Sequence, residues 1–176
     1  MTQQGKNAID LVLAESLIEL SAKKPIDKIT IKEITDKAGV IRPTFYNHFQ
    51  DKYELIEWII KTELLEPIKP LLNAGMIFEA IVLMLNNITA NSVFYKKALK
   101  LEGAVTFNQI AMKCVYEMFM NIISEKSTGK KSKYRWLTPE VISTYYAQSL
   151  CFITEGWIAR AWMILSRRRW LRRTCI

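Results

Sequence analysis

The sequence contains no apolar run approaching the roughly 18 residues that a membrane-spanning helix needs. Its first residues, Met1 to Gly5, lack the apolar stretch of a signal peptide. Cys114, Cys151 and Cys175 are odd in number and include no close pair, which argues against a disulfide framework or a zinc site. These absences predict a cytoplasmic chain that does not engage a membrane.

Histidine is scarcer still, because His48 is the only one in the chain. The sequence also lacks a cluster of metal-ligand residues and a glycine-rich loop that could cradle phosphate. We therefore expect no enzyme activity, no cofactor and no metal site. Half of the 176 residues are hydrophobic, which predicts a globular chain with one substantial core or with a small domain joined to a larger one.

The formal net charge of +8 is not in itself evidence for nucleic-acid binding, because of where it lies. Residues 1–55 contain eight Lys or Arg and eight Asp or Glu, so this part is balanced. The excess lies in residues 126–135 and near the C-terminus, where the arginines are Arg160, Arg167, Arg168, Arg169, Arg172 and Arg173. Local geometry must therefore indicate any DNA-binding surface.

Hydrophobic spacing predicts helices throughout, so we expect an all-α fold. The first helix has an apolar face at intervals of three and four residues. Thr30 and Glu33 form a capping box that opens a second, short helix, and Gly39 ends it. The apolar face of the first helix comprises Ile9, Val12, Leu13, Leu17 and Leu20.

A third helix of about two turns is expected from Arg42 to His48, with Pro43 in its first turn. A weaker cap signal at Asp51 opens a long helix, which Pro67 and Pro70 should end or bend. Two short helices joined by a glycine-containing turn and flanked by longer helices form a helix-turn-helix arrangement. Such a unit places its second short helix in the major groove of DNA.

The third helix has side chains for two different faces. Val40, Phe45 and Phe49 can point inward and brace it. The residues expected to point outward are rich in hydrogen-bonding groups suited to DNA phosphates and base edges. The alternative is that this segment is an ordinary core helix. The outward residues are Arg42, Thr44, Tyr46, Asn47 and His48, with Lys52 in the first turn of the next helix.

Residues 29–60, ITIKEITDKAGVIRPTFYNHFQDKYELIEWII, resemble the DNA-binding domain of the TetR family of bacterial transcriptional regulators. The matching features are the Thr before the second helix, the Ala-Gly-Val turn and Thr-Phe-Tyr-Asn-His-Phe followed by Lys and Glu-Leu. The resemblance covers roughly residues 6 to 65. Ile41 departs from the family, in which Ser, Thr or Asn is common at this position and caps the recognition helix; its presence should weaken the cap.

The resemblance implies which residues contact DNA. In this family the aromatic residues lock the recognition helix onto its neighbours and the polar residues between them face DNA. His48 has an alternative, structural reading, in which it is hydrogen-bonded within the domain. The implied contact set is Thr30, Arg42, Pro43, Thr44, Tyr46, Asn47, His48 and Lys52, with Arg42 and Thr44 assigned to base edges and Tyr46, His48 and Lys52 to phosphates.

The C-terminal half is expected to be helical, and the resemblance implies that it holds an effector pocket and a dimer interface made by the last two helices. Some family members bind partner proteins instead of a conventional effector. Residues 91–97, NSVFYKK, look like the branch that includes a dihydroxyacetone-kinase operon activator. Bulky side chains in this half are candidates to line the pocket, and core packing is the alternative role for each of them. The candidates are Met84, Phe94, Phe107, Met112, Tyr116, Tyr145 and Trp157, together with Met76, Phe78, Trp136 and Tyr146.

The basic tail, residues 159–176, has three open readings: an amphipathic segment suited to a membrane surface or a nucleic acid, a disordered tail, or a frameshift product. Codons permitted for residues 161–176, read one nucleotide out of frame, can encode Gly-Met-Asp-Asp-Ile and then Pro-Glu-Glu-Met-Ala-Glu-Glu, an acidic helix suited to the dimer interface. Sequencing the gene around the Ala161 codon tests the frameshift hypothesis, and an in-frame tail without that alternative removes it.

Together these observations predict a cytoplasmic DNA-binding regulator with three parts. They are a helix-turn-helix domain at residues 1–50, a connecting helix at 51–73, and an effector-binding and dimerisation domain at 74–176. We expect a homodimer on a palindromic double-stranded DNA operator, controlled by a small apolar effector or a protein co-regulator, as repressor or activator. The alternative from another class is a helical interaction module whose basic tail docks on a membrane or an acidic partner.

Overall fold

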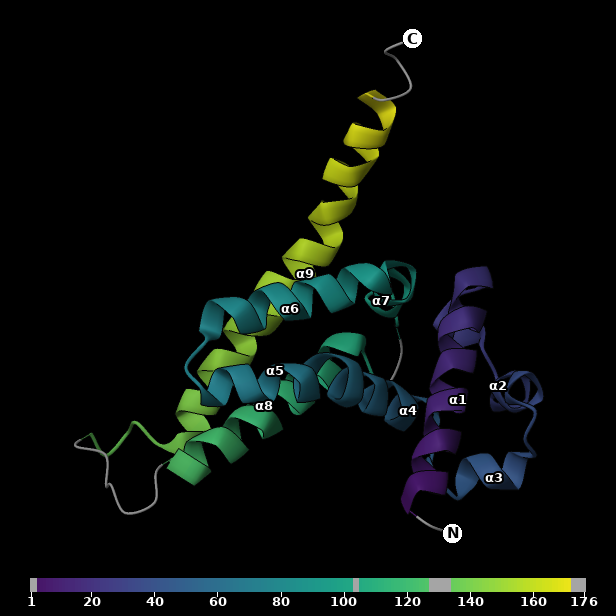
Figure 1. Cartoon of the computed structure of the whole chain (residues 1–176), viewed down its shortest axis with the longest axis horizontal. Coiled ribbons are helices and arrows are strands. Elements are labelled where there is room, and N and C mark those ends of the chain that lie inside the picture. Colours follow the sequence, from purple (N-terminus) through teal and green to yellow (C-terminus); the bar gives the residue numbers. More distant parts are fainter. Residues whose placement is uncertain (1–2, 103–104, 127–133, 172–176) are drawn as a thin grey trace.

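The computed structural model describes residues 3–102, 105–126 and 134–171, and its regular elements there are helical. Three helices form a cluster at one end: α1 (Gln3–Lys23), α2 (Ile31–Ala38) and α3 (Arg42–Tyr46). From this cluster α4 (Lys52–Ile59) leads into a bundle of the remaining helices (Figure 1). The all-α fold expected from hydrophobic spacing is confirmed.

The cluster is held by a shared apolar core. Leu13 and Leu17 of α1, Ile34 of α2, Phe45 of α3 and Leu55 of α4 are all fully buried. Helices α2, α3 and α4 are each too short to be stable alone, so most of their stability comes from burying this face. The core therefore fixes how α3 lies against the other three helices.

Local signals place the ends of the short helices as expected. The Thr30 Oγ1 accepts from the Glu33 N–H at 3.3 Å, and the Glu33 carboxylate accepts from the Thr30 N–H at 2.9 Å, which completes the capping box. Gly39 follows α2 with φ of 69°, a left-handed conformation that glycine adopts without steric cost. At the start of α4, Asp51 accepts from the Tyr53 and Glu54 N–H groups. These three boundaries were predicted correctly.

The two prolines after α4 do not end the helical run. Instead, α4 passes through a π-helical segment, η2 (Ile60–Leu65), into α5 (Glu66–Asn73). A π-turn widens the backbone and shifts which carbonyl each N–H meets, so the helical run continues through Pro67, which has no N–H. Pro70 lies inside α5. The expected break is therefore a change of helix type just before Pro67.

The C-terminal bundle comprises α6 (Ile77–Ala90), α7 (Ser92–Ala98), α8 (Phe107–Lys126) and α9 (Pro139–Leu171). The Thr138 hydroxyl accepts from the Val141 N–H at 3.4 Å, as its position before Pro139 predicted. Helix α9 continues to Leu171, beyond the expected end near Arg160, and its last turns extend past the bundle (Figure 1). In the described chain, no single helix has both the length and the apolar character to cross a membrane.

Candidate nucleic-acid interface and C-terminal cavity

Helix α3 has one buried and one exposed face, as the sequence predicted. Phe45 is fully buried and Phe49 is 4% exposed, and their rings lie 5.9 Å apart. Tyr46 is 52% exposed, and its ring meets that of Phe45 edge-on at 5.7 Å. Arg42, Pro43 and Asn47 are exposed and Thr44 is half-buried. The aromatic residues thus brace the helix while a polar surface remains available for a ligand.

The N-terminal end of α3 has only backbone support. Ile41 occupies the N-cap position without a side-chain cap, and it is 69% exposed. The Thr44 N–H donates to the Ile41 carbonyl at 2.9 Å. Because an isoleucine side chain cannot accept a hydrogen bond, this helix end lacks the side-chain cap that Ser, Thr or Asn would supply.

His48 does not present its ring to solvent, which corrects its place in the expected contact set. Its side chain is 2% exposed, and Nδ1 lies 2.6 Å from Oδ1 of Asp10, whose side chain is 8% exposed. The ring also packs at 6.4 Å against that of Phe49. The structural reading of His48 is therefore the one that the geometry supports, because a buried ring cannot reach a phosphate.

Lys52 is also turned inward rather than toward an external phosphate. Its Nζ donates to the carbonyls of Ile26, Asp27 and Ile29, at 3.1, 2.8 and 3.2 Å. These residues belong to the 3-10 turn η1 (Ile26–Lys28) and its end, so Lys52 ties α4 to the α1–α2 connection. Desolvation lowers the pKa of Lys52. An ammonium group has three donors, and all three are used here.

Thr30 is exposed at the start of α2, but its hydroxyl already takes part in the cap. Lys24 binds the Glu33 carboxylate at 2.5 Å, and this contact, followed by the Thr30 hydrogen bonds, lowers the pKa of Glu33 to about 2. Glu33 therefore stays ionised and holds the Thr30 backbone. A DNA contact by Thr30 would add to this network without replacing it.

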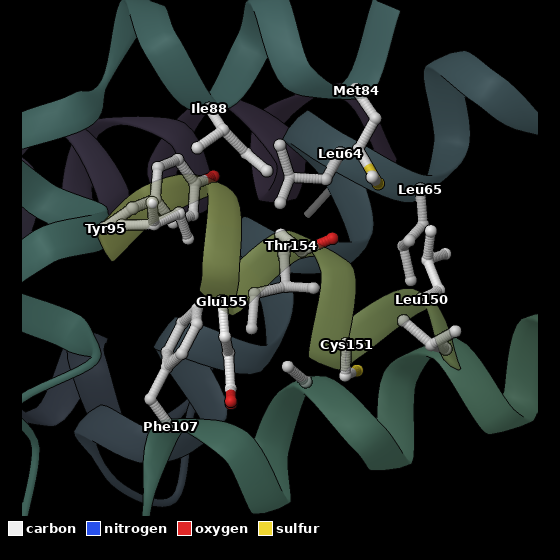
Figure 2. A pocket seen from close by; sticks show the side chains of 14 residues that line it. Leu64, Leu65, Met84, Ile88, Tyr95, Phe107, Leu150, Cys151, Thr154 and Glu155 are labelled. Carbon is white, nitrogen blue, oxygen red and sulfur yellow. The ribbon is translucent and has the colours of Figure 1, made fainter. Parts of the chain in front are cut away.

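A small cavity of about 40 Å³ lies in the C-terminal bundle. Helices α6 and α8 lie on opposite sides of it and α9 passes between them (Figure 2). Within the described chain, the Tyr95 and Thr154 hydroxyls are buried without a hydrogen-bond partner, and both residues line this cavity. Its lining is otherwise mainly apolar: Ile60, Leu64, Leu65, Met84, Ile88, Phe107, Ala111, Val115, Leu150, Cys151, Glu155 and Ile158.

Of the seven residues proposed to line an effector pocket, Met84 and Phe107 line this cavity. Phe94 is buried beside Tyr95 with the rings 5.1 Å apart, and it belongs to the core. Met112 borders a separate open depression between α8 and α9, and Tyr116 packs half-buried against the core.

The remaining proposed lining residues are on the surface and do not line the 40 Å³ cavity. Bulk alone cannot distinguish a cavity wall from an exposed apolar face, since both use large side chains. The exposed fractions are 65% for Tyr145, 41% for Trp157, 42% for Met76, 75% for Phe78, 69% for Trp136 and 49% for Tyr146.

The described residues include no group of three or more His, Cys, Asp or Glu side chains that could hold a metal ion.

Burial raises the pKa of the Cys114 thiol to about 12 and that of Cys151 to about 11, so both remain protonated at neutral pH. Neither is thereby activated as a nucleophile.

A helix-turn-helix with a braced second helix, joined to a separate helical bundle, defines the class of helix-turn-helix transcription regulators. Residues 15–59 match the family model described as bacterial regulatory proteins, tetR family, and residues 76–162 match the model for a transcriptional regulator C-terminal region. The two matches together span most of the chain. The chain belongs to the TetR family, and it is a transcriptional regulator and not an enzyme.

A curated relative is the HTH-type dhaKLM operon transcriptional activator DhaS of Lactococcus lactis subsp. lactis (strain IL1403). It is 26% identical over 151 residues, which cover 85% of this chain and 79% of the relative. This match agrees with the family branch indicated by residues 91–97.

Two solved structures share the fold. One is the dihydroxyacetone kinase operon activator DhaS, with a TM-score of 0.56 and 22% identity over 87% of this chain and 85% of that chain. The other is NalD, the secondary repressor of the MexAB-OprM multidrug efflux pump in Pseudomonas aeruginosa, with a TM-score of 0.55 and 12% identity over 88% and 86%.

The C-terminal family match ends at residue 162, close to the Ala161 codon at which the frameshift hypothesis begins. The backbone of α9 continues to Leu171, and residues 172–176 lie outside the described residues. The arginines from Arg167 onward are therefore beyond the part of the chain that the family model describes.

Proposed function

We propose that this regulator binds a palindromic DNA operator as a homodimer and that its C-terminal domain receives the controlling signal. The observation that carries the proposal is the exposed polar face of α3. Arg42, Pro43, Tyr46 and Asn47 lie on this face, with Thr44 partly exposed beside them. With the inward-turned His48 and Lys52 removed, these five residues and Thr30 are the proposed DNA contacts.

Within this set the residues have different roles. Arg42, at the first position of α3, can pair its planar guanidinium with both major-groove acceptors of a guanine. Thr44 is the second candidate for a base edge. The Tyr46 hydroxyl is suited to a phosphate, and the short side chain of Asn47 can reach either a phosphate or an adenine.

Support for a homodimer comes from the outward face of α9. Phe152 is 79% exposed, Tyr145 is 65% exposed and Ile153 is 57% exposed. Large apolar side chains exposed together on one helix can mark a surface that meets a partner. Phe152 borders the depression between α8 and α9, so a second copy related by twofold symmetry could place its own Phe152 there.

The size of the internal cavity bears on how the protein is controlled. At about 40 Å³, it has room for roughly one to three water molecules, whereas small-molecule sites usually measure about 300–1,000 Å³. A small effector bound in this cavity would therefore have to open the core. A protein co-regulator that binds the outer surface needs no such opening, and for that reason we favour it for this chain.

Selection of DNA from a random-sequence library tests the central proposal. We expect the wild-type protein to enrich a sequence with twofold symmetry, with half-sites about one helical turn apart. A variant that ends before Arg167 should enrich the same sequence, because the proposed contacts lie in α2 and α3. Loss of all DNA binding on removal of the tail would instead favour the interaction-module alternative.

A further inference from the structure

Asp10 occupies an unexpected place on the buried stripe of α1. Leu13, Ala14, Leu17 and Ser21 follow it at helical spacing, and all four are buried. Asp10 itself is 6% exposed. Removing a carboxylate from water is costly unless hydrogen bonds compensate for the loss. A charged group at this core position therefore needs a specific partner.

That partner is His48, 38 residues further along the chain and just beyond the end of α3. The Asp10 Oδ1 to His48 Nδ1 distance is 2.6 Å, and both side chains are nearly excluded from solvent. Because a carboxylate can only accept, Nδ1 of the imidazole donates to it. This hydrogen bond joins the C-terminal end of the recognition segment to α1, with its partners shielded from competing water.

Helix α3 needs such a connection because it has only five residues, fewer than two turns. Its N-cap, Ile41, offers no side-chain hydrogen bond. Phe45 and Phe49 hold the segment by apolar burial, which has little directional preference. A short hydrogen bond is directional and can fix the rotation of the segment about its axis.

We propose that Asp10 is a positioning residue for DNA recognition, acting through His48 to set the rotation of α3 relative to α1. This inference deepens the proposed function and rests on it. Bidentate hydrogen bonds to base edges demand a fixed geometry, whereas attraction to phosphates tolerates small rotations. Loss of the hydrogen bond should therefore reduce discrimination between operator and other DNA more than it reduces general affinity.

The experiment measures the ratio of dissociation constants for non-operator and operator DNA, using the full chain and an operator selected by the wild-type protein. Asp10→Ala removes the acceptor, and we expect the ratio to fall at least tenfold with non-operator affinity unchanged. Asp10→Asn retains an acceptor oxygen, so we expect it to keep most of the discrimination. The salt dependence of non-operator binding should be the same in all variants.

A second pair of variants probes the donor. The Asn side-chain nitrogen can take the place of His Nδ1, whereas the longer Gln places its nitrogen nearer the position of Nε2. We therefore expect His48→Asn to retain more discrimination than His48→Gln. Ser21→Ala is the matched control on α1, because it removes a buried hydroxyl that donates to the Ile18 carbonyl at 2.6 Å, at the other end of the helix. It should leave the ratio unchanged.

The outcomes separate positioning from general stabilisation. Equal loss of operator and non-operator affinity in Asp10→Ala, or an unchanged ratio, overturns the proposal. If Asp10→Ala does not fold, the His48 pair decides: selective loss in His48→Gln supports positioning, and equal behaviour of the two variants overturns it. A wild-type protein that selects no sequence overturns the proposed function as well, whereas a selective wild type with a fully selective Asp10→Ala variant overturns the positioning role alone.

Discussion

The Asn87 side-chain nitrogen lies 2.9 Å from the backbone carbonyl oxygen of Glu63 and donates a hydrogen bond to it. In a regular α-helix that carbonyl would accept from residue 67, but Pro67 has no N–H. A side chain of α6 therefore satisfies a backbone group at the π-helical segment. This hydrogen bond joins α6 to the connection between the DNA-binding helices and the bundle.

We expect Asn87→Ala to lower the free energy of unfolding by about 1–3 kcal/mol, because it leaves a partly buried carbonyl without this partner. Asn86→Ala is the matched control, since Asn86 is the exposed neighbour on the same helix. Urea denaturation of both variants measures the difference. Equal stability of the two variants would show that the Glu63 carbonyl finds another partner, such as water.

Glu63 also gives a prediction for pH dependence. Burial raises the pKa of its carboxyl; the Asn91 hydrogen bond opposes this shift, and Glu15 adds to it. The folded protein therefore holds the Glu63 proton more tightly than the unfolded chain, so ionisation of Glu63 reduces stability as the pH rises. We expect Glu63→Gln to remove this loss while keeping an acceptor for Asn91.

The gain in stability of Glu63→Gln over the wild-type protein should be absent below the ordinary glutamate pKa of about 4.3. It should be complete above the raised pKa of Glu63 in the folded state. Thermal melting of both proteins across this range measures it. An advantage that instead grows as the pH falls would contradict the direction of the shift.

Lys52 should behave as a structural residue. Lys52→Ala removes three hydrogen bonds to the turn at residues 26–29, and we expect a loss of about 1–3 kcal/mol in stability. The salt slope of DNA binding should not change, since no phosphate contact is removed. A slope lower by about one with unchanged stability would show that the ammonium turns outward to DNA.

Substitutions of Arg42 and Phe45 should have different effects on DNA binding and stability, because the two residues lie on opposite faces of α3. Arg42→Ala should preserve the fold and non-specific binding, and it should flatten base preference at one symmetric pair of operator positions by about 1–3 kcal/mol. Phe45→Ala should lower stability by about 3–5 kcal/mol. Thermal melts and binding to an operator library distinguish these effects, and the reverse pattern would mean that the two faces are assigned wrongly.

Phe152→Asp should convert the proposed homodimer to a monomer, because it places a charge on the apolar face of α9. Phe78→Asp is the control, since Phe78 is 75% exposed, close to the 79% of Phe152, but lies on α6. Light scattering after size-exclusion chromatography gives the mass of each variant. A Phe152→Asp protein that remains dimeric would place the interface elsewhere.

The sequence predicted best those features that depend on neighbouring residues. The Thr30 capping box, the Gly39 turn and the inward Phe45 follow from local chemistry and periodicity, and all three are present. The orientations of His48 and Lys52 could not be predicted this way, because their partners lie 23 or more residues away in sequence. One signal was available for His48: a charged Asp10 at helical spacing from Leu13 and Leu17.

The proposed pocket shows a related limit. Large apolar side chains are needed both in cores and on faces that meet another surface, so size could not separate Phe107, which lines the cavity, from Tyr145, which faces outward. The sequence pattern also did not predict the π-helical segment. Proline signals a missing N–H, but it does not show which group will meet the carbonyl left free, as Asn87 of α6 does for Glu63 here.

Different residues of the α3 segment hold it in place and face the solvent, and this separation affects how the protein could diverge or be redesigned. The side chains that hold the recognition segment in place, Phe45, Phe49 and His48, are buried, whereas Arg42, Tyr46 and Asn47 are free at the surface. Substitutions at the exposed positions therefore have little effect on the scaffold. The same framework could acquire a new target sequence through a few exchanges on one face, with no compensating change in the core.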